Sequence, residues 1–228
     1  MCIDNEPINN ITVKYRFPIP RIDDMLDELS GSQIFSKIDL STTKEEHLKH
    51  LETVFQILRK NKLFGKLEKC TFIASEVKFL GYIVSGRGVS LDQDKIEVVK
   101  SWPVPKTIIE VRGFHGLASF YGRFIKNFSA LAAPITECMK KGEFKWTDNA
   151  LQAFRLIKKL LCEAPILRLL DFNCLFEVEC DASSVGIGAV LIQERKPVAY
   201  FSEKLNRSKL SYLTYNKEFY AIIRALMH

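Results

Sequence analysis

Cysteines, histidines and acidic side chains are the residues of this 228-residue chain that could hold a metal ion or carry out chemistry. The six cysteines are spread along the sequence, and no two of them form a C-x-x-C pair. Zinc sites and disulfide frameworks need closer and more regular spacing, so we interpret the cysteines as scattered thiols in a reducing compartment. His47 and His50 have no cysteine or carboxylate at ligand spacing, and we expect both to be solvated on one polar helix face.

Acidic residues stand out at three places. Asp23 and Asp24 are the only adjacent aspartates, Asp181 ends an alternating run of apolar and polar residues, and Glu218 falls inside a helical pattern. A strand-end aspartate can be a turn former, and a helix glutamate can be solvated. The pattern alone favours these structural interpretations for Asp181 and Glu218, and metal binding is the alternative.

The net charge is +6, from 33 Lys and Arg against 27 Asp and Glu. This mild excess suits a polyanionic partner, but many basic proteins bind no nucleic acid. Basic residues recur from Lys44 to Lys106 and are then interleaved with aromatic ones, at Arg112, Phe114, Phe120, Tyr121, Arg123, Phe124, Lys126, Phe128, Lys140 and Lys141. A solvated face opposite a packed apolar face gives the same pattern, so nucleic-acid contact and simple solvation both stay open.

Neither a membrane span nor a secretory signal is expected. No stretch reaches the roughly 18 consecutive apolar residues that a spanning helix needs. The start, Met1-Cys2-Ile3-Asp4, shows no basic region followed by an apolar run. We therefore expect an intracellular protein, cytoplasmic or nuclear, with no membrane partner.

The N-terminal part of the sequence predicts loop, strand and one clear helix. Prolines block an early helix, a short helix fits residues 22–29, and residues 34–40 alternate as a half-buried strand does. Thr43 and Glu46 form a capping box, which predicts a helix from about Lys44 to Asn61. Residues 77–84 predict a strand, and two glycines before Val89 turn it into a small hairpin.

Helices follow, and then strands. We expect helices over 93–102, from Thr107, over 129–140 and from Thr147 as far as Pro165. Beyond Pro165 the pattern predicts strands over 176–181, 186–193 and 197–202, and a helix over 217–227. The expected fold class is therefore α/β, of the mixed α+β kind, with three antiparallel strands and a helix at the C-terminal end.

Four stretches carry a resemblance to a known family. Residues 11–40 closely resemble the fingers-to-palm segment of gypsy-type LTR retrotransposon reverse transcriptases. Residues 175–226, with Phe-Glu-Val-Glu-Cys-Asp-Ala-Ser-Ser-Val-Gly-Ile-Gly-Ala-Val-Leu near their start, resemble the beginning of the RNase H domain in the same polyproteins. Between them, residues 79–85 and 116–125 look like that family's late-palm hairpin and thumb. The resemblance extends over nearly the whole chain in the expected order.

The resemblance implies two metal-dependent sites and Mg²⁺ as the cofactor. A polymerase of this family is expected to hold two divalent ions about 3.5–4 Å apart on palm carboxylates, and Asp39 matches the first of these carboxylates. RNase H chemistry is expected to use four carboxylates, of which Asp181 matches the first and Glu218 the second. In this interpretation Asp39, Asp181 and Glu218 are ancestral metal ligands, and nucleic acid, as an RNA–DNA hybrid or a primer–template duplex, is the implied partner.

Parts of both expected sites have no counterpart in the sequence. There is no Y-x-D-D motif, and Leu40 runs directly into Ser41 where related proteins have a long block with the catalytic hairpin. Asp23 and Asp24 fall at a family position without a metal role. The last two RNase H carboxylates would lie beyond His228. We therefore expect neither polymerisation nor RNA cleavage, and only weak magnesium binding, because one or two carboxylates cannot organise a two-metal centre.

The expected organisation has three parts: a fingers and palm remnant over 1–91, a thumb-like helical region over 92–143, and the N-terminal part of an RNase H-like domain over 144–228. The function that we favour is a catalytically defective reverse transcriptase/RNase H-like protein. One alternative is a domesticated nucleic-acid-binding module that uses the basic helices of residues 93–141. Another is an active RNA-directed DNA polymerase, if the true gene product is longer. The sequence does not predict an oligomeric state.

Overall fold

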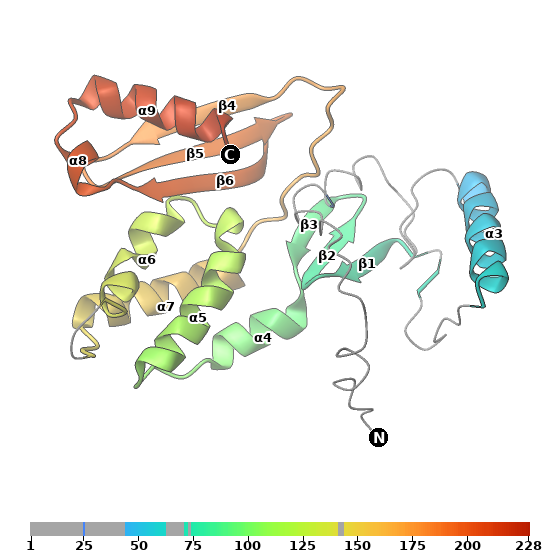
Figure 1. The fold of residues 1–228 in the computed structure, drawn as a ribbon, viewed down its shortest axis with the longest axis horizontal. Helices are drawn as coiled ribbons and strands as arrows, with labels where there is room; N and C mark the ends of the chain where they lie inside the picture. Colours follow the sequence, from blue (N-terminus) through green and yellow to red (C-terminus); the bar gives the residue numbers. More distant parts are fainter. Residues whose placement is uncertain (1–24, 26–43, 63–70, 73, 141–143) are drawn as a thin grey trace.

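A computed structural model describes residues 25, 44–62, 71–72, 74–140 and 144–228. The predicted helix over 22–29, the predicted strand over 34–40, Asp39 and the Leu40–Ser41 junction lie outside the described residues, apart from Met25. Within the described part, no helix is long and apolar enough to cross a membrane. Figure 1 shows a first sheet beside a group of helices, which lies against a second sheet.

The first helix of substantial length is α3, Lys44–Lys60. It agrees with the helix predicted from about Lys44 to Asn61, and its last turn carries Arg59 and Lys60, which interact favourably with the helix dipole. Leu51 is its buried residue, and the Phe55 ring meets that of Phe72 edge to face at a centroid distance of 5.8 Å.

The first sheet consists of β1 (Glu76–Phe79), β2 (Tyr82–Ser85) and β3 (Gly88–Leu91), all antiparallel in the order β1-β2-β3. The prediction of one strand over 77–84 was wrong, because the chain reverses at Leu80 and Gly81. Both residues have positive φ, 47° and 86°, as the central residues of a type I′ hairpin turn require. The predicted second turn, between Ser85 and Gly88, is confirmed.

A helical bundle follows: α4 (Gln93–Ser101), α5 (Ile108–Phe120), the short 3₁₀ helix η2 (Gly122–Phe124), α6 (Phe128–Glu137) and α7 (Asp148–Cys162). Side-chain caps fix the starts of three of them. The Asp92 carboxylate accepts from the Asp94 amide, the Thr107 hydroxyl from the Glu110 amide, and the Thr147 hydroxyl from the Ala150 amide. Glu110 reaches back to the amide of Lys106 at 2.7 Å, one residue earlier than in a standard capping box.

The main core lies between the first sheet and this bundle. Tyr82, Phe114, Tyr121 and Phe154 are almost completely buried, and the Phe114 and Phe154 rings lie 4.5 Å apart. The Tyr82 hydroxyl donates to the Phe120 carbonyl, and the Tyr121 hydroxyl donates to the Gly81 carbonyl. Each buried phenol therefore has a hydrogen-bond partner across the sheet–helix boundary, as buried polar groups require.

The second sheet contains β4 (Glu177–Ala182), β5 (Gly186–Gln193) and β6 (Lys196–Lys204), antiparallel in the order β4-β5-β6. After a short helix, α8 (Arg207–Leu210), the helix α9 (Thr214–Leu226) lies against β4 and β5. The three predicted strands and the C-terminal helix are confirmed. The short helix α8 was not predicted, and α9 begins at Thr214, three residues before its predicted start at Lys217.

Backbone and side-chain hydrogen bonds join the second sheet to the rest. Leu167 exchanges both backbone hydrogen bonds with Val89 of β3, at 2.7 and 2.8 Å, and the next residue, Arg168, donates to the Pro197 carbonyl of β6. At the start of α6, Ser129 makes two hydrogen bonds with Ser202 of β6, at 2.8 and 2.7 Å. Figure 1 shows β6 as the strand beside α6 and β4 on the side of the sheet away from the bundle.

Candidate functional site

Asp181 lies in β4, one residue before the strand ends, and its side chain is exposed. Its neighbours Cys180 and Ala182 pack against the small core beneath α9, with Ile187 and Ala221. Because successive side chains of a strand point to opposite faces, Asp181 lies on the face of the sheet away from α9. The sequence analysis had placed Asp181 at the strand end, and the structure puts it opposite Gly188 of β5.

Glu218 lies on α9 and is also exposed. The orientation of the helix follows from its contacts: Ala221 faces the sheet, and Tyr220 and Arg224 both bond to Glu203 of β6. At 100° per residue, Glu218 then falls on the opposite flank of the helix, the flank on the β4 side. Asp181 and Glu218 are thus carried by two elements that pack together, β4 and α9.

A complete metal centre is not formed in the described part of the chain. No group of three or more His, Cys, Asp or Glu side chains there could hold a metal ion. Neither Asp181 nor Glu218 has an ion-pair partner among the described residues. A two-metal nuclease centre needs a larger cluster of carboxylates, so these two residues do not fit the Mg²⁺ pair that the family resemblance implies.

The most strongly interacting acidic residue near this helix is Glu203 of β6, which the sequence analysis did not single out. Arg224 Nε donates to its Oε2 at 2.6 Å, and the Tyr220 hydroxyl donates to its Oε1 at 3.0 Å. Lys209 Nζ in turn donates to the Tyr220 hydroxyl and lies 4.0 Å from the centre of its ring. Burial by itself raises the pKa of Glu203, but the Arg224 and Tyr220 hydrogen bonds outweigh it, and the net pKa lies below its ordinary value. This network orients α9 on the sheet.

The basic and aromatic residues between 112 and 128 separate into two faces. Phe114, Tyr121 and Phe124 are at most 2% exposed and belong to the core, so they are not free to stack on bases. Phe120 is 43% exposed and remains available at the surface. Arg112 of α5 and Lys126 are exposed. For the buried aromatics, the interpretation as a packed apolar face is therefore confirmed.

The exposed face of α5 carries Arg112 and, one turn before it, Ile109, which is 75% exposed. Gly116 and Ser119 follow at helical spacing and are exposed, and a Cβ at Gly116 would meet no atom within 4 Å. Ser119 Oγ lies 3.4 Å from Nδ1 of His115, whose pKa is lowered by partial burial. This face is exposed, carries Arg112 and has no side chain at Gly116, so it permits close approach of a polyanionic backbone.

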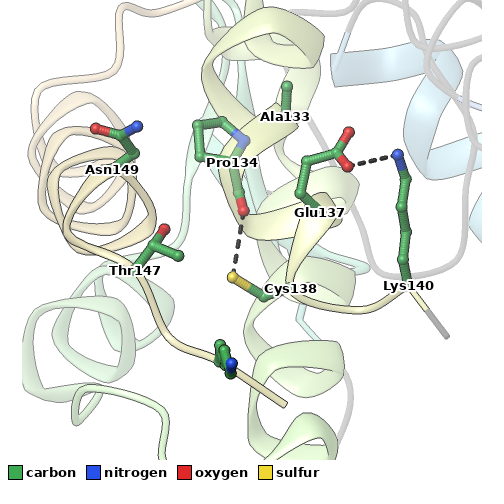
Figure 2. A pocket seen from close by; sticks show the side chains of 8 residues that line it. Ala133, Pro134, Glu137, Cys138, Lys140, Thr147 and Asn149 are labelled. Atoms are coloured by element: carbon green, nitrogen blue, oxygen red, sulfur yellow. Dashed lines mark hydrogen bonds and ion pairs between the residues drawn. The ribbon is translucent and has the colours of Figure 1, made fainter. Parts of the chain in front are cut away.

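Lys140 belongs to a different place, a hollow of about 480 Å³ between the end of α6 and the start of α7. Figure 2 shows Glu137 paired with Lys140, and Cys138 donating to the Pro134 carbonyl. Hydrogen bonds from Lys140 and Lys204 hold the pKa of Glu137 below its ordinary value. The hollow contains neither Asp181 nor Glu218, and its acid–base pair is already satisfied. Lys141 lies outside the described residues.

Similar proteins match this chain over different lengths, from the C-terminal part alone to the whole chain. Residues 146–228 match the model of the RNase H-like domain found in reverse transcriptase. The transposon Tf2-3 and Tf2-4 polyproteins of Schizosaccharomyces pombe are 30% identical over 302 aligned positions, covering 100% of this chain. The chain spans 23% of the length of these polyproteins.

Solved structures of the foamy viral protease-reverse transcriptase are also similar. The complex with an RNA/DNA hybrid is 27% identical, with a TM-score of 0.76, and the match covers 90% of this chain and 29% of the viral one. The complex with double-stranded DNA is 28% identical, with the same TM-score of 0.76, over 90% of this chain and 45% of the viral one. Together with the two three-stranded sheets and their helices, these similarities support a fragment of a retroelement Pol polyprotein, with an RNase H-like domain of reverse transcriptase at residues 146–228.

Proposed function

We propose that this chain is a gypsy-type Pol fragment that binds nucleic-acid duplexes but neither copies nor cleaves them. The observation that carries the proposal is the similarity, over 90% of the chain, to a foamy viral protein that was solved in complex with an RNA/DNA hybrid. The net charge of +6 and the exposed basic residues of the bundle favour the same class of partner.

The surface that we assign to the duplex is the open face of α5, with Arg112 at one end and Lys126 beyond the following turn. Small side chains at Gly116 and Ser119 let a sugar–phosphate backbone come close to the helix. Contacts of this kind are made to phosphates, so they give affinity without sequence preference and weaken as salt is raised.

The absence of polymerisation rests on the sequence. No Y-x-D-D motif occurs anywhere in the 228 residues, and Asp39 is left without its two partner carboxylates. The alignment with the Tf2 polyproteins runs over 302 positions although the chain has 228 residues, so it includes positions that this chain lacks. That difference supports an internal deletion, which we place at Leu40–Ser41.

The absence of RNA cleavage rests on the site. Asp181 and Glu218 are both exposed, and no third carboxylate joins them in a metal-binding group among the described residues. Two exposed carboxylates bind Mg²⁺ weakly, because each ion in such a centre needs several oxygen ligands besides water.

Fluorescence anisotropy with a labelled RNA–DNA hybrid tests the binding proposal. We expect saturable binding at 50 mM salt and a loss of roughly tenfold or more at 200 mM, as expected for several phosphate contacts. Arg112→Ala should weaken binding and lower the dependence on salt by about one phosphate contact. Arg155→Ala, which removes an exposed arginine of α7, is the matched control and should leave affinity unchanged. Absence of binding at 50 mM salt, or equal effects of the two substitutions, would refute the proposal.

A second candidate is an active polymerase whose gene product is longer than this chain. It requires that the gene encodes the missing block between the codons of Leu40 and Ser41. Sequencing of the transcript across these codons distinguishes the two candidates. An in-frame Y-x-D-D segment would support the enzyme, and a direct Leu40–Ser41 junction would support the inactive fragment.

A further inference from the structure

His115 of α5 is half-buried and has a hydroxyl group at each of its two ring nitrogens. On one side, Thr136 Oγ1 of α6 lies 3.3 Å from Nε2, so the ring bridges α5 and α6. On the other side, Ser119 Oγ, one turn later on α5, lies 3.4 Å from Nδ1. Ser119 is exposed, so it separates the ring from the outer face of the helix.

The two hydroxyl groups determine which nitrogen of the neutral ring carries the proton. The Thr136 hydroxyl has one proton, which it donates to the Ala132 carbonyl at 3.0 Å. Towards His115 the Thr136 oxygen can then only accept, so the ring proton is on Nε2. Nδ1 of the neutral ring is left with a lone pair, and the Ser119 hydroxyl donates to it. The single proton of Ser119 is thereby used inside the protein.

Ser119 lies on the face of α5 that we assign to the duplex. Arg112 and Ser119 are seven residues apart, close to two helical turns, so they share this face with a separation of about 10.5 Å along the axis. Between them Gly116 has no side chain, and a Cβ there would meet nothing within 4 Å. A sugar–phosphate backbone on this face that contacts Arg112 can therefore present another phosphate to Ser119.

A phosphate at Ser119 competes with His115 for the hydroxyl proton. If Ser119 donates to the phosphate, its oxygen lone pairs face the lone pair on Nδ1 of the neutral ring. A proton added to Nδ1 removes this repulsion, because the ring then donates to Ser119 Oγ while Ser119 donates to the phosphate. The positive ring also strengthens the hydrogen bonds to the negative phosphate.

We propose that Ser119 and His115 form a proton-linked phosphate site on α5, in which Ser119 donates to a phosphate of the duplex backbone and His115 takes up a proton from the solvent at Nδ1. Ser119 contacts the ligand, and His115 is a positioning residue that acts through it. Duplex binding and proton binding then favour each other, since coupling between two ligands is reciprocal. This inference rests on the proposed duplex face of α5 and adds a dependence of its affinity on pH.

The charges around His115 leave this change to the phosphate. The elements in contact with α5 on this side are α6 and η2. The charged side chains of the three elements, other than His115, are Glu110, Arg112, Arg123 and Glu137. Burial is the one cause that lowers the pKa of His115, so the ring is neutral at pH 7 before a phosphate arrives.

A pH series of duplex binding tests the proposal on the full chain. The probe is a labelled RNA–DNA hybrid, followed by fluorescence anisotropy from pH 7.5 to pH 5.5 at constant ionic strength in buffers without phosphate. We expect the affinity of the wild type to rise about tenfold over this range, because a pKa that binding raises by one unit corresponds to a tenfold gain. His115→Gln, which can still donate to Thr136 but cannot take up a proton, should show at most about a twofold change. His228→Gln removes an exposed histidine elsewhere and should keep the rise.

Substitutions of Ser119 test the path of the coupling. Ser119→Ala removes the hydroxyl between the ring and the phosphate, so we expect weaker binding at pH 5.5 and a flatter pH profile. Ser119→Thr keeps a hydroxyl and should restore the wild-type profile. Circular dichroism checks that each variant is folded, and a purely structural role of Ser119 would lower the affinity equally at every pH.

Nuclear magnetic resonance measures the proton uptake directly. The chain has four histidines, so the ring signal that His115→Gln lacks is that of His115. We expect its pKa to lie below the ordinary value of 6.5 in the free chain and to rise on addition of the hybrid. A pH profile that His115→Gln leaves unchanged, or a pKa of His115 that does not rise on binding, would overturn this inference while duplex binding by α5 stands. Absence of binding at every pH would overturn both.

Discussion

Two glycine-to-alanine substitutions are expected to change the stability of this chain in opposite directions. Gly88 begins β3 and has a φ of +127°, which L-residues rarely adopt. A Cβ at this position would lie 2.1 Å from the Leu167 carbonyl oxygen, so the segment that leads to the second sheet would have to move. Gly116, in contrast, lies within α5, and its Cβ would meet nothing within 4 Å.

The magnitudes follow from these surroundings. A residue held at such a φ costs about 1–3 kcal/mol. Displacement of Leu167 also removes its two hydrogen bonds with Val89, of 2.7 and 2.8 Å, each with a net contribution of about 0.5–1.5 kcal/mol. We therefore expect Gly88→Ala to destabilise the fold by roughly 2–6 kcal/mol. Gly116→Ala should stabilise it by about 0.5–1 kcal/mol, because glycine is unfavourable inside a helix.

Urea denaturation followed by far-UV circular dichroism measures both effects. The midpoint should fall for Gly88→Ala and rise for Gly116→Ala, with a similar slope for each, because neither changes the surface exposed on unfolding by much. If Gly88→Ala were neutral or stabilising, the close contact between Gly88 and Leu167 would not exist, and the proposed attachment of the second sheet to β3 would be refuted.

Three further predictions concern the core, the Glu203 network and a tight turn. Phe114→Ala, at a fully buried ring, should destabilise by about 3–5 kcal/mol in the same urea assay, and a loss below 1 kcal/mol would contradict the core assignment. Because the pKa of Glu203 is lowered, its stabilisation is present above the ordinary value of 4.5 and is lost as the pH falls through the lower folded value. Arg224→Ala should therefore be less stable than the wild type at pH 7, with a difference that shrinks below pH 4.5, and a constant difference in acid melts would argue against the network. Arg195→Gly, at a φ of 61° between β5 and β6, should raise the melting temperature by relieving left-handed strain of about 1 kcal/mol, and a lower melting temperature would contradict this conformation of the turn.

Local signals in the sequence were sufficient for most of the elements. The threonines at 107 and 147 mark the starts of α5 and α7 because their hydroxyls cap the first turns. The turn at Leu80 and Gly81 was missed because Leu80 is apolar, and an apolar residue at positive φ gives no turn signal. The glycine at position 81 was the one residue type there that favours a turn. The short helix α8, which the Asn206 side chain caps, has too few residues to show an apolar period.

The candidate site could be predicted from the sequence less completely than the helices and strands. Asp181 and Glu218 were identified by family resemblance, and their spacing in the chain does not indicate that they lie on two elements that pack together, β4 and α9. Glu203 was missed because its importance comes from Tyr220 and Arg224, which are distant in sequence and meet it only when α9 packs on the sheet. The aromatics near Arg112 gave a mixed signal, since core packing and base stacking use the same residue types.

The most direct test of the account uses one labelled primer–template, an RNA strand annealed to a shorter DNA primer, with the full chain, Mg²⁺ and all four deoxynucleotides. A native gel and a denaturing gel of the same sample report binding, extension and cleavage together. The account predicts a retarded complex in the native gel and, in the denaturing gel, a primer and an RNA strand of unchanged length. Extension of the primer, or Mg²⁺-dependent cutting of the RNA within the hybrid, would contradict it.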